Sequence, residues 1–339
     1  MSRIFGLSAT AKRGSITLGS LLALTLVGCS QDSGDAPAAD AAPPAPAADT
    51  GPAAYVFDRP AVAPSPPASD LLGRGEYLVE SIVGCGNCHS GRDDDGEFVP
   101  GQEFAGNFVI AEPGFTAYAP NITPDPETGI GDWSNEELER AIREGISRDG
   151  RVMGPPMAFP YYRDISTTDM NAIIAYLRTR PAVNREVPAS TFNIPLPPNW
   201  GPPVETPVPD VPRSDSLAYG RYLTHTLGHC TQCHTPLVEG VEDFSRIGAG
   251  MNIYPQPFGY DWSALAANIT QHETLGIGQW TDDEIKRAIT MGISRDGRSL
   301  LPFMGFDFYA KISDEDLELI VEYVKTLPPS EATPPTGEE

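Results

Sequence analysis

The stretches Cys85-Gly-Asn-Cys88-His89 and Cys230-Thr-Gln-Cys233-His234 lie at matching places in two copies of one segment. The similarity continues on both sides of these stretches. It is strongest where residues 131–162 align with residues 278–309, and 17 of those 32 positions are identical. A duplication of this extent predicts two units built to the same plan.

Each stretch has the C-x-x-C-H spacing with which c-type haem is attached covalently. Two thiols three positions apart can add to the two vinyl groups of haem, and the histidine that follows presents its imidazole to the iron. A thioredoxin-like disulfide would need a strand–helix pattern that neither stretch has, and a four-thiolate zinc site would leave both histidines unexplained. We therefore expect two covalently bound haem c groups, attached through Cys85, Cys88, Cys230 and Cys233 and ligated by His89 and His234.

Two methionines are candidates for the second ligand of each iron. Methionine has this role in cytochromes c, where it raises the reduction potential. Met157 and Met304 align between the copies, follow a nearby proline, and lie 68 and 70 residues after the candidate proximal histidines. We predict that both are iron ligands.

Three histidines of the second copy are alternative ligands there. His225 and His229 align with Glu80 and Gly84, and His272 has no counterpart in the first copy. Because the copies are otherwise so similar, we expect exposed surface positions for these three.

Two tryptophans, Trp133 and Trp280, also align between the copies. A buried indole N–H needs an acceptor, which a haem propionate would supply. Plain core packing explains the pair equally well, so both interpretations stay open.

The first 28 residues are typical of an export signal that ends at a lipid-attachment cysteine. A positive flank precedes an uncharged apolar stretch at residues 16–28, which is too short to span a bilayer. Leu26-Val27-Gly28-Cys29 resembles the lipobox of bacterial lipoproteins, and an ordinary cleaved secretory signal is the alternative. We expect a lipid on Cys29 to anchor the protein to the periplasmic side of a bacterial membrane, where Ser30 favours the outer membrane.

The charge balance restricts the partners. There are 46 acidic and 23 basic residues, which gives a formal net charge of −23 at pH 7. Phosphate binding needs clustered Lys and Arg, so nucleic acid is excluded as a partner. An acidic surface attracts a redox partner with a basic docking face.

With these residues identified, the chain resembles the bacterial cytochromes c that accompany periplasmic dehydrogenases of the alcohol, aldehyde and gluconate type. The resemblance rests on both C-x-x-C-H motifs, on Asn121-Ile-Thr-Pro-Asp-Pro-Glu-Thr-Gly-Ile-Gly-x-Trp133, and on a Ser-Arg-Asp-Gly-Arg … Pro-x-Met loop in each copy. It implies electron transfer through low-spin haem with His/Met ligation. Such subunits often carry three haem motifs, whereas this sequence has two.

The expected fold class is all-α, with two tandem cytochrome c domains joined by a proline-rich linker. Capping-box patterns start a helix at Ser134 and at Thr281, and apolar residues spaced i, i+3, i+4, i+7 mark a last helix in each copy. The stretches between lack sustained alternation, so we expect loops there. The expected boundaries are a signal peptide at 1–28, a disordered tether at 29–69, cytochrome c domains at 70–182 and 214–328, a linker at 183–213 and a disordered tail at 329–339.

The expected function is electron transfer rather than catalysis. We expect a lipid-anchored dihaem carrier that takes electrons from a periplasmic dehydrogenase or quinol oxidase and passes them towards a terminal acceptor. One alternative is a dihaem peroxidase-like enzyme, which would lack a distal ligand in one copy. The other is a tightly bound electron-transfer subunit of a dehydrogenase complex.

Overall fold

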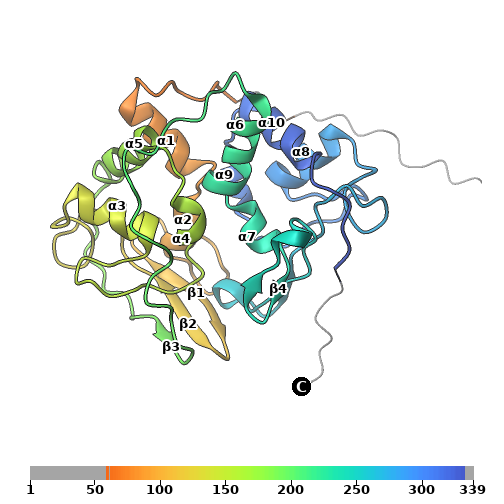
Figure 1. Cartoon of the computed structure of the whole chain (residues 1–339). Coiled ribbons are helices and arrows are strands. Elements are labelled where there is room, and N and C mark those ends of the chain that lie inside the picture. Colours follow the sequence, from red (N-terminus) through yellow and green to blue (C-terminus); the bar gives the residue numbers. More distant parts are fainter. Residues whose placement is uncertain (1–58, 61, 333–339) are drawn as a thin grey trace, which may run out of the picture. The chain divides into compact units, whose positions relative to one another are not determined.

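The computed structural model of the chain describes residues 59, 60 and 62–332 (Figure 1). All of these residues belong to one compact unit. The predicted signal peptide, Cys29 and most of the predicted tether lie outside the described residues. Within the described part of the chain, no helix is both long enough and apolar enough to cross a membrane.

The helices follow the sequence repeat. The first copy contains α1 (Leu71–Glu80), α2 (Cys85–His89), α3 (Asn135–Glu144), α4 (Phe159–Tyr162) and α5 (Thr167–Leu177). The second contains α6 (Ser216–Arg221), the π-helical segment η1 (Tyr222–Leu227), α7 (Cys230–His234), α8 (Asp282–Met291), α9 (Phe306–Tyr309) and α10 (Asp314–Val324). Two short 3-10 turns, η2 (Phe244–Arg246) and η3 (Pro257–Gly259), lie between α7 and α8.

The capping boxes predicted from the sequence are confirmed at α3 and α8. The Ser134 hydroxyl accepts a hydrogen bond from the backbone N–H of Glu137, whose carboxylate accepts one from the backbone N–H of Ser134. The equivalent threonine and glutamate start α8 in the same way. These reciprocal bonds satisfy N–H groups that a helix start leaves without a partner.

The first and last helices of each copy pack together through a glycine. A Cβ added to Gly75 in α1 would lie 2.1 Å from the carbonyl oxygen of Ala172 in α5. A Cβ on Gly220 in α6 would lie 2.3 Å from the carbonyl oxygen of Leu319 in α10. Only glycine allows two helix backbones to approach this closely.

The all-α prediction is wrong, because the chain also forms three small sheets. One is the antiparallel sheet of β1 (Asn107–Glu112), β2 (Phe115–Ala119) and β3 (Thr191–Phe192). The other two are hairpins: β4 (Leu237–Val238) with β5 (Val241–Glu242), and β6 (Ile253–Pro255) with β7 (Ser263–Leu265).

An irregular register explains why the largest sheet was not predicted. Phe108 pairs with Tyr118, but Ile110 pairs with Ala117, so the strand bulges at Val109. A bulge interrupts the alternation of inward and outward side chains that identifies a strand in a sequence. The remaining strands have only two or three residues, and so short a strand has no period to detect.

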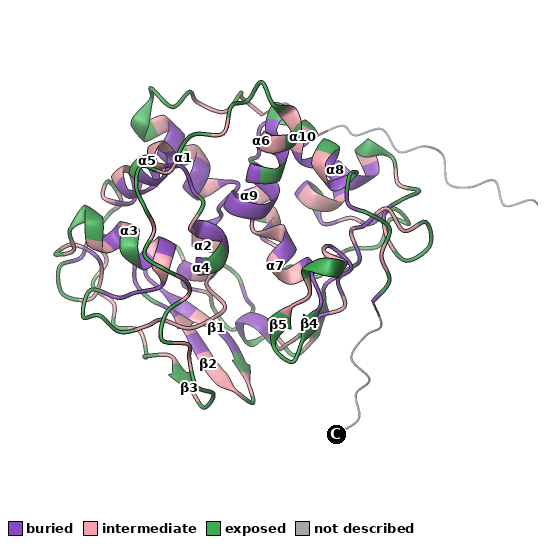
Figure 2. Cartoon of the chain, in the orientation of Figure 1, coloured by how far each residue is buried: buried purple, intermediate pink, exposed green. Residues whose placement is uncertain are grey.

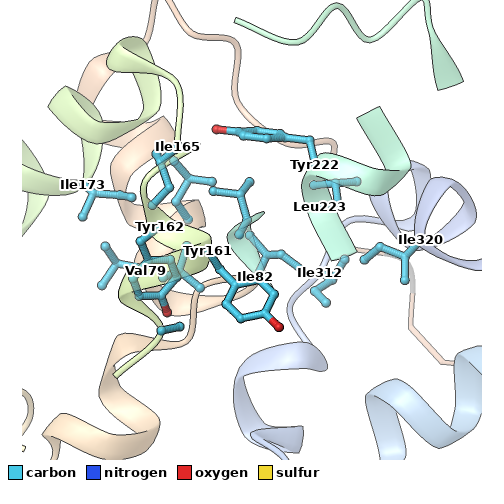
Figure 3. Close-up of a cluster of buried hydrophobic side chains, with 14 of the residues drawn as sticks. Val79, Ile82, Tyr161, Tyr162, Ile165, Ile173, Tyr222, Leu223, Ile312 and Ile320 are labelled. Atoms are coloured by element: carbon cyan, nitrogen blue, oxygen red, sulfur yellow. The ribbon is translucent and has the colours of Figure 1, made fainter. Parts of the chain in front are cut away.

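The two copies share one hydrophobic core. Ile82 and Ile165 from the first copy and Leu223 and Ile312 from the second are each at most 1% exposed and belong to one cluster. Figure 3 shows these four side chains in the same apolar cluster as Tyr222. Leu223 lies in η1, and the other three lie in the turns that follow α1, α4 and α9. In Figure 2 helices of both copies carry purple, which marks buried residues.

Two equivalent tyrosines, one from each copy, form hydrogen bonds with the other copy. The hydroxyl of Tyr222 accepts from the backbone N–H of Ser166 at 3.1 Å and donates to a carboxylate oxygen of Asp169 at 2.8 Å. The hydroxyl of Tyr77 makes the same two bonds in the second copy, with Ser313 at 3.2 Å and Asp316 at 2.8 Å. Each tyrosine therefore lies at the start of the last helix of the other copy.

The two buried aspartates obtain their positive partners differently. Asp169 pairs with Arg74 of α1 at 2.8 Å. The position equivalent to Arg74 is Tyr219, and Asp316 instead pairs with Arg213, which precedes α6. Both carboxylates are thus neutralised by a guanidinium, as a buried charge requires.

Candidate functional site

Each C-x-x-C-H stretch forms a single helical turn. Cys85 and His89 are the first and last residues of α2, and Cys230 and His234 hold the same places in α7. Residues three and four positions apart lie on one face of a helix. Both cysteines and the histidine of each motif therefore lie on the same face.

The residue before each motif has a left-handed backbone. Gly84 precedes α2 with φ of 58°, and His229 precedes α7 with φ of 38°. Each of these residues lies directly before the first residue of the motif helix. The left-handed conformation comes at no steric cost at glycine, whereas at His229 it is strained.

The histidines of both motifs are held in the same tautomer. Nδ1 of His89 lies 2.8 Å from the carbonyl oxygen of Pro120, and Nδ1 of His234 lies 2.6 Å from that of Ala267. A carbonyl only accepts, so Nδ1 carries the hydrogen and Nε2 keeps its lone pair. Burial lowers the pKa of both imidazoles, which keeps them neutral. Neutral imidazole anchored through Nδ1 is the form in which histidine ligates a metal, so both residues fit a haem iron.

The cysteines do not fit a redox disulfide. All four are unbridged. Burial, with a smaller contribution from Glu80, raises the pKa of Cys85 to about 12, and burial raises that of Cys230 to about 12. Redox-active cysteines have a lowered pKa instead.

The zinc alternative also lacks support. Over residues 59–332 without residue 61, no group of three or more His, Cys, Asp or Glu side chains is arranged to hold a metal ion. A four-thiolate zinc site needs such a group.

Met157 and Met304 lie in loops that share a closing bridge and a backbone hydrogen bond, although the Pro155–Pro156 peptide bond of the first loop is cis and the equivalent bond of the second is not. The Ser-Arg-Asp-Gly-Arg turn before each loop is closed by one antiparallel bridge, Ile146 to Val152 in the first copy and Ile293 to Ser299 in the second. The carbonyl of each methionine then accepts from a backbone N–H two residues on, at 2.9 Å in both copies. Both methionines are partly buried. The structure thus repeats the methionine position that the sequence repeats.

The prediction of exposed positions for the other three histidines is wrong. His225 is buried, and both of its ring nitrogens are engaged, by the hydroxyls of Tyr323 at 2.8 Å and Thr231 at 3.0 Å. His229 packs its ring edge-on against Tyr162. His272 is partly buried, and its Nδ1 accepts from the backbone N–H of Leu275 at 3.1 Å.

The position of His225 has a structural reason in the repeat. Its first-copy equivalent, Glu80, accepts from the hydroxyl of Tyr176 at 3.0 Å, and Tyr176 is the equivalent of Tyr323. The same contact between the first and last helices is therefore made by different side chains. The alignment of His225 with Glu80 did not reveal this contact, because the two side chains differ in chemistry.

Trp133 and Trp280 occupy equivalent positions against the core. Both are partly buried and pack on the hydrophobic cluster. Their backbone N–H groups close equivalent turns, onto the carbonyls of Ile130 at 3.1 Å and Ile277 at 2.9 Å. The structure thus shows the packing role, and a propionate contact stays a prediction.

The two motifs also lie close to each other. The Cys233 thiol is among the groups that raise the pKa of Cys88, after burial, which is the largest cause. In addition, α9 of the second copy packs on α2 of the first, where a Cβ on Gly86 would lie 2.8 Å from the ring of Phe308. Sequence analysis did not predict this proximity, since it depends on contacts between distant parts of the chain.

Comparison with known proteins agrees with this geometry. Residues 74–181 match the family model described as Cytochrome c. The chain is 31% identical over 281 residues to the gluconate 2-dehydrogenase cytochrome c subunit of Pantoea cypripedii, a match that covers 78% of this chain and 61% of that protein. It is 31% identical over 272 residues to the alcohol dehydrogenase (quinone) cytochrome c subunit of Gluconobacter oxydans, covering 76% of this chain and 55% of that subunit.

A shorter relative is covered more fully. The diheme cytochrome c-type protein of Cereibacter sphaeroides is 29% identical over 276 residues, which cover 75% of this chain and 85% of that protein. The chain spans less than two thirds of either dehydrogenase subunit. Residues 74–181 are a cytochrome c domain, and the chain is homologous to cytochrome c subunits of dehydrogenases.

Proposed function

We propose that this chain, whose residues 74–181 are a cytochrome c domain, is a dihaem electron-transfer protein that serves a dehydrogenase. A cytochrome c domain implies covalently bound haem c. Two such groups are proposed here, because the second motif repeats the first in sequence and in structure.

The observation that carries the proposal is the matched state of the two motif histidines. Both are neutral, both donate from Nδ1 to a backbone carbonyl, and both leave Nε2 for a metal. The carbonyls fix the plane of each imidazole before any ligand binds. Two independent motifs with the same arrangement support the same cofactor at each.

The remaining ligands are assigned from the repeat. Cys85, Cys88, Cys230 and Cys233 would form the thioether bonds, and Met157 and Met304 would complete the coordination of the two irons. Haem with both axial positions filled supplies one-electron transfer rather than substrate activation. The chain's own residues then serve to orient the imidazoles, exclude water from the motifs and keep the two centres close together.

The proposed electron donor is a dehydrogenase. Relatives of this chain are named as cytochrome c subunits of gluconate and alcohol dehydrogenases. The formal charge of −23 supports docking to a basic face of the catalytic subunit, since complementary charge speeds encounter. The chain itself would carry electrons onward to a terminal acceptor and would not catalyse substrate oxidation.

The proposed location is the periplasmic side of a bacterial membrane, with a lipid on Cys29 as the anchor. The support comes from the sequence, in which Cys29 follows an apolar stretch and Leu26-Val27-Gly28. A lipid-anchored protein stays near membrane-bound dehydrogenases while it exchanges electrons with them.

A haem count tests the cofactor assignment. The protein is matured in a host with haem-attachment machinery, denatured in acid and extracted with organic solvent. Two haem groups per chain should stay with the polypeptide, and the double variant Cys230→Ala/Cys233→Ala should retain one. Extraction of all pigment from the unmodified protein would refute covalent attachment.

Copurification tests the assigned role. A dehydrogenase catalytic subunit should accompany the protein in fixed stoichiometry from detergent-solubilised membranes and should reduce its haem when substrate is added. A high-spin iron signal in one copy, with peroxide turnover and no dehydrogenase, would favour the peroxidase-like alternative.

A further inference from the structure

The residue before the second cysteine of each C-x-x-C-H motif has an amide side chain. It is Asn87 in the first motif and Gln232 in the second. The side chain of Asn87 donates to the carbonyl oxygen of Phe303 at 3.4 Å. The side chain of Gln232 donates to the carbonyl oxygen of Pro156 at 2.9 Å. Phe303 and Pro156 are themselves equivalent positions of the two copies. The same hydrogen bond therefore runs from the first copy to the second and from the second copy to the first.

Each accepting carbonyl belongs to the residue just before a candidate iron ligand. Pro156 precedes Met157, and Phe303 precedes Met304. Each motif thus contacts the methionine loop of the opposite copy. A loop is held most effectively through its backbone close to the side chain that must be positioned.

Neighbouring groups keep the Asn87 amide in place. Oδ1 of Asn87 accepts from Arg92 at 2.9 Å, which orients the amide towards the loop. A Cβ on Gly305, the residue after Met304, would lie 3.3 Å from the Asn87 side chain, so the loop packs directly on the amide. On the other side, the ring of Tyr162, which closes α4, contacts His229 just before the second motif.

We propose that Asn87 and Gln232 are positioning residues that couple the two haem sites. Gln232, in the motif of the second haem, holds Met157 on the iron of the first, and Asn87, in the motif of the first haem, holds Met304 on the iron of the second. The inference rests on the proposed function in that it requires methionine ligation at both irons. Its consequence is that a change at one attachment motif alters the ligation of the other haem.

Displacement of methionine by added imidazole measures how firmly each loop is held. To observe one haem at a time, the Met304→His variant keeps the second iron bound to two histidines, which leaves the first iron as the site where imidazole competes with Met157. In this background, Gln232→Ala should raise the affinity of the ferric protein for imidazole roughly fivefold, the factor that corresponds to the loss of one ordinary hydrogen bond.

The mirror experiment exchanges the two copies. In the Met157→His background, Asn87→Ala should raise the imidazole affinity of the second haem, while Gln232→Ala should leave that affinity unchanged. Asn87→Gln, which keeps an N–H donor, should raise the imidazole affinity less than Asn87→Ala does. Asn193→Ala is the matched control, because Asn193 is an exposed amide outside both motifs and both methionine loops.

Two results would overturn the coupling. If Gln232→Ala changes only the haem of its own motif, or neither haem, the amide does not position the opposite loop. If the parent variants Met157→His and Met304→His bind imidazole as the unmodified protein does, methionine ligation itself fails and the coupling falls with it. The first result leaves the proposed function intact, and the second does not.

Discussion

Among the five histidines, the engaged ring nitrogens separate the two candidate ligands from His225. His89 and His234 use Nδ1 for a backbone carbonyl, and Nε2 is left for a metal. His225 has hydroxyl partners at both nitrogens. The repeat in the sequence disfavoured His225 as an iron ligand, and these two hydrogen bonds give the physical reason.

Replacement of either candidate methionine should lower a reduction potential. Met157→His and Met304→His should each keep haem attached, because the cysteines are untouched. Each should lower the potential of its own haem, since methionine ligation raises the potential relative to imidazole. Potentiometric titration of the single variants measures this directly, and midpoints identical to those of the unmodified protein would remove these residues as ligands.

His225 should make stability depend on pH. Burial, followed by the charge of Arg221, lowers the pKa of His225 to about 4. The unfolded chain therefore takes up a proton below about pH 6.5 while the folded protein does not. Stability is unaffected above that pH and falls as the pH drops towards 4, with a loss of about 2 kcal/mol between pH 7 and pH 5.

Unfolding of His225→Gln at both pH values isolates this contribution. The variant should be less stable at pH 7, because it loses contacts with Tyr323 and Thr231. Its stability should change less between pH 7 and pH 5 than that of the unmodified protein. Equal pH dependence in the two proteins would show that His225 titrates normally in the folded state.

At the scale of elements, the two helix crossings depend on glycine. In both crossings the nearest atom to an added Cβ is a backbone carbonyl oxygen, which cannot rotate away. The helices themselves must move apart to accept a methyl group. The cost therefore falls on the packing of the whole pair, not on one side chain.

Gly75→Ala and Gly220→Ala should each destabilise the fold by about 3 kcal/mol, the upper end for overpacking. Chemical denaturation of the two variants measures the loss. Gly114→Ala is a suitable control, because its added Cβ would meet only the flexible side chain of Ile194, at 3.1 Å. A loss at Gly75 no larger than that of the control would show that the crossing is looser than the structure has it.

The helices were predictable because their causes are local. The cap of α3 needs only Ser134 and Glu137, three residues apart, and a single sequence contains that information. The β1–β2 hairpin was missed because Val109 adds a residue to one strand and breaks the alternation. The all-α fold class failed at these elements and not at the helices.

The candidate ligands were predicted from the sequence, whereas the arrangement of the site was not. The C-x-x-C-H spacing and the repeated methionines were read directly from the sequence. The contact of Asn87 with Phe303 spans 216 positions and leaves no periodic pattern. Burial of His225 was hidden as well, because its partner Tyr323 lies 98 positions away.

At the scale of the whole molecule, the core and both methionine loops connect the two copies. The apolar cluster includes residues of both, and each motif contacts the loop of the other. The copies are therefore packed against each other and are not independent domains on a flexible linker. The two copies are joined by direct contacts through this core and these loops.

Attachment to a membrane should depend on one residue outside this core. Cys29→Ala should release the protein into the soluble fraction with both haem groups still bound, because haem attachment uses other cysteines. Cell fractionation followed by haem staining measures both outcomes. A variant that remains in the membrane fraction would contradict lipid anchoring at Cys29.

The two tyrosine contacts between the copies are related by an approximate twofold symmetry. Tyr77 of the first copy bonds to the start of α10, and Tyr222 of the second bonds to the start of α5. Each copy therefore has both the tyrosine and the helix start that make this contact. Surfaces that are complementary to themselves are what close a symmetric pair of identical subunits. The chain therefore has the layout of a symmetric dimer joined end to end, in which Arg213 gives Asp316 the guanidinium that Arg74 gives Asp169.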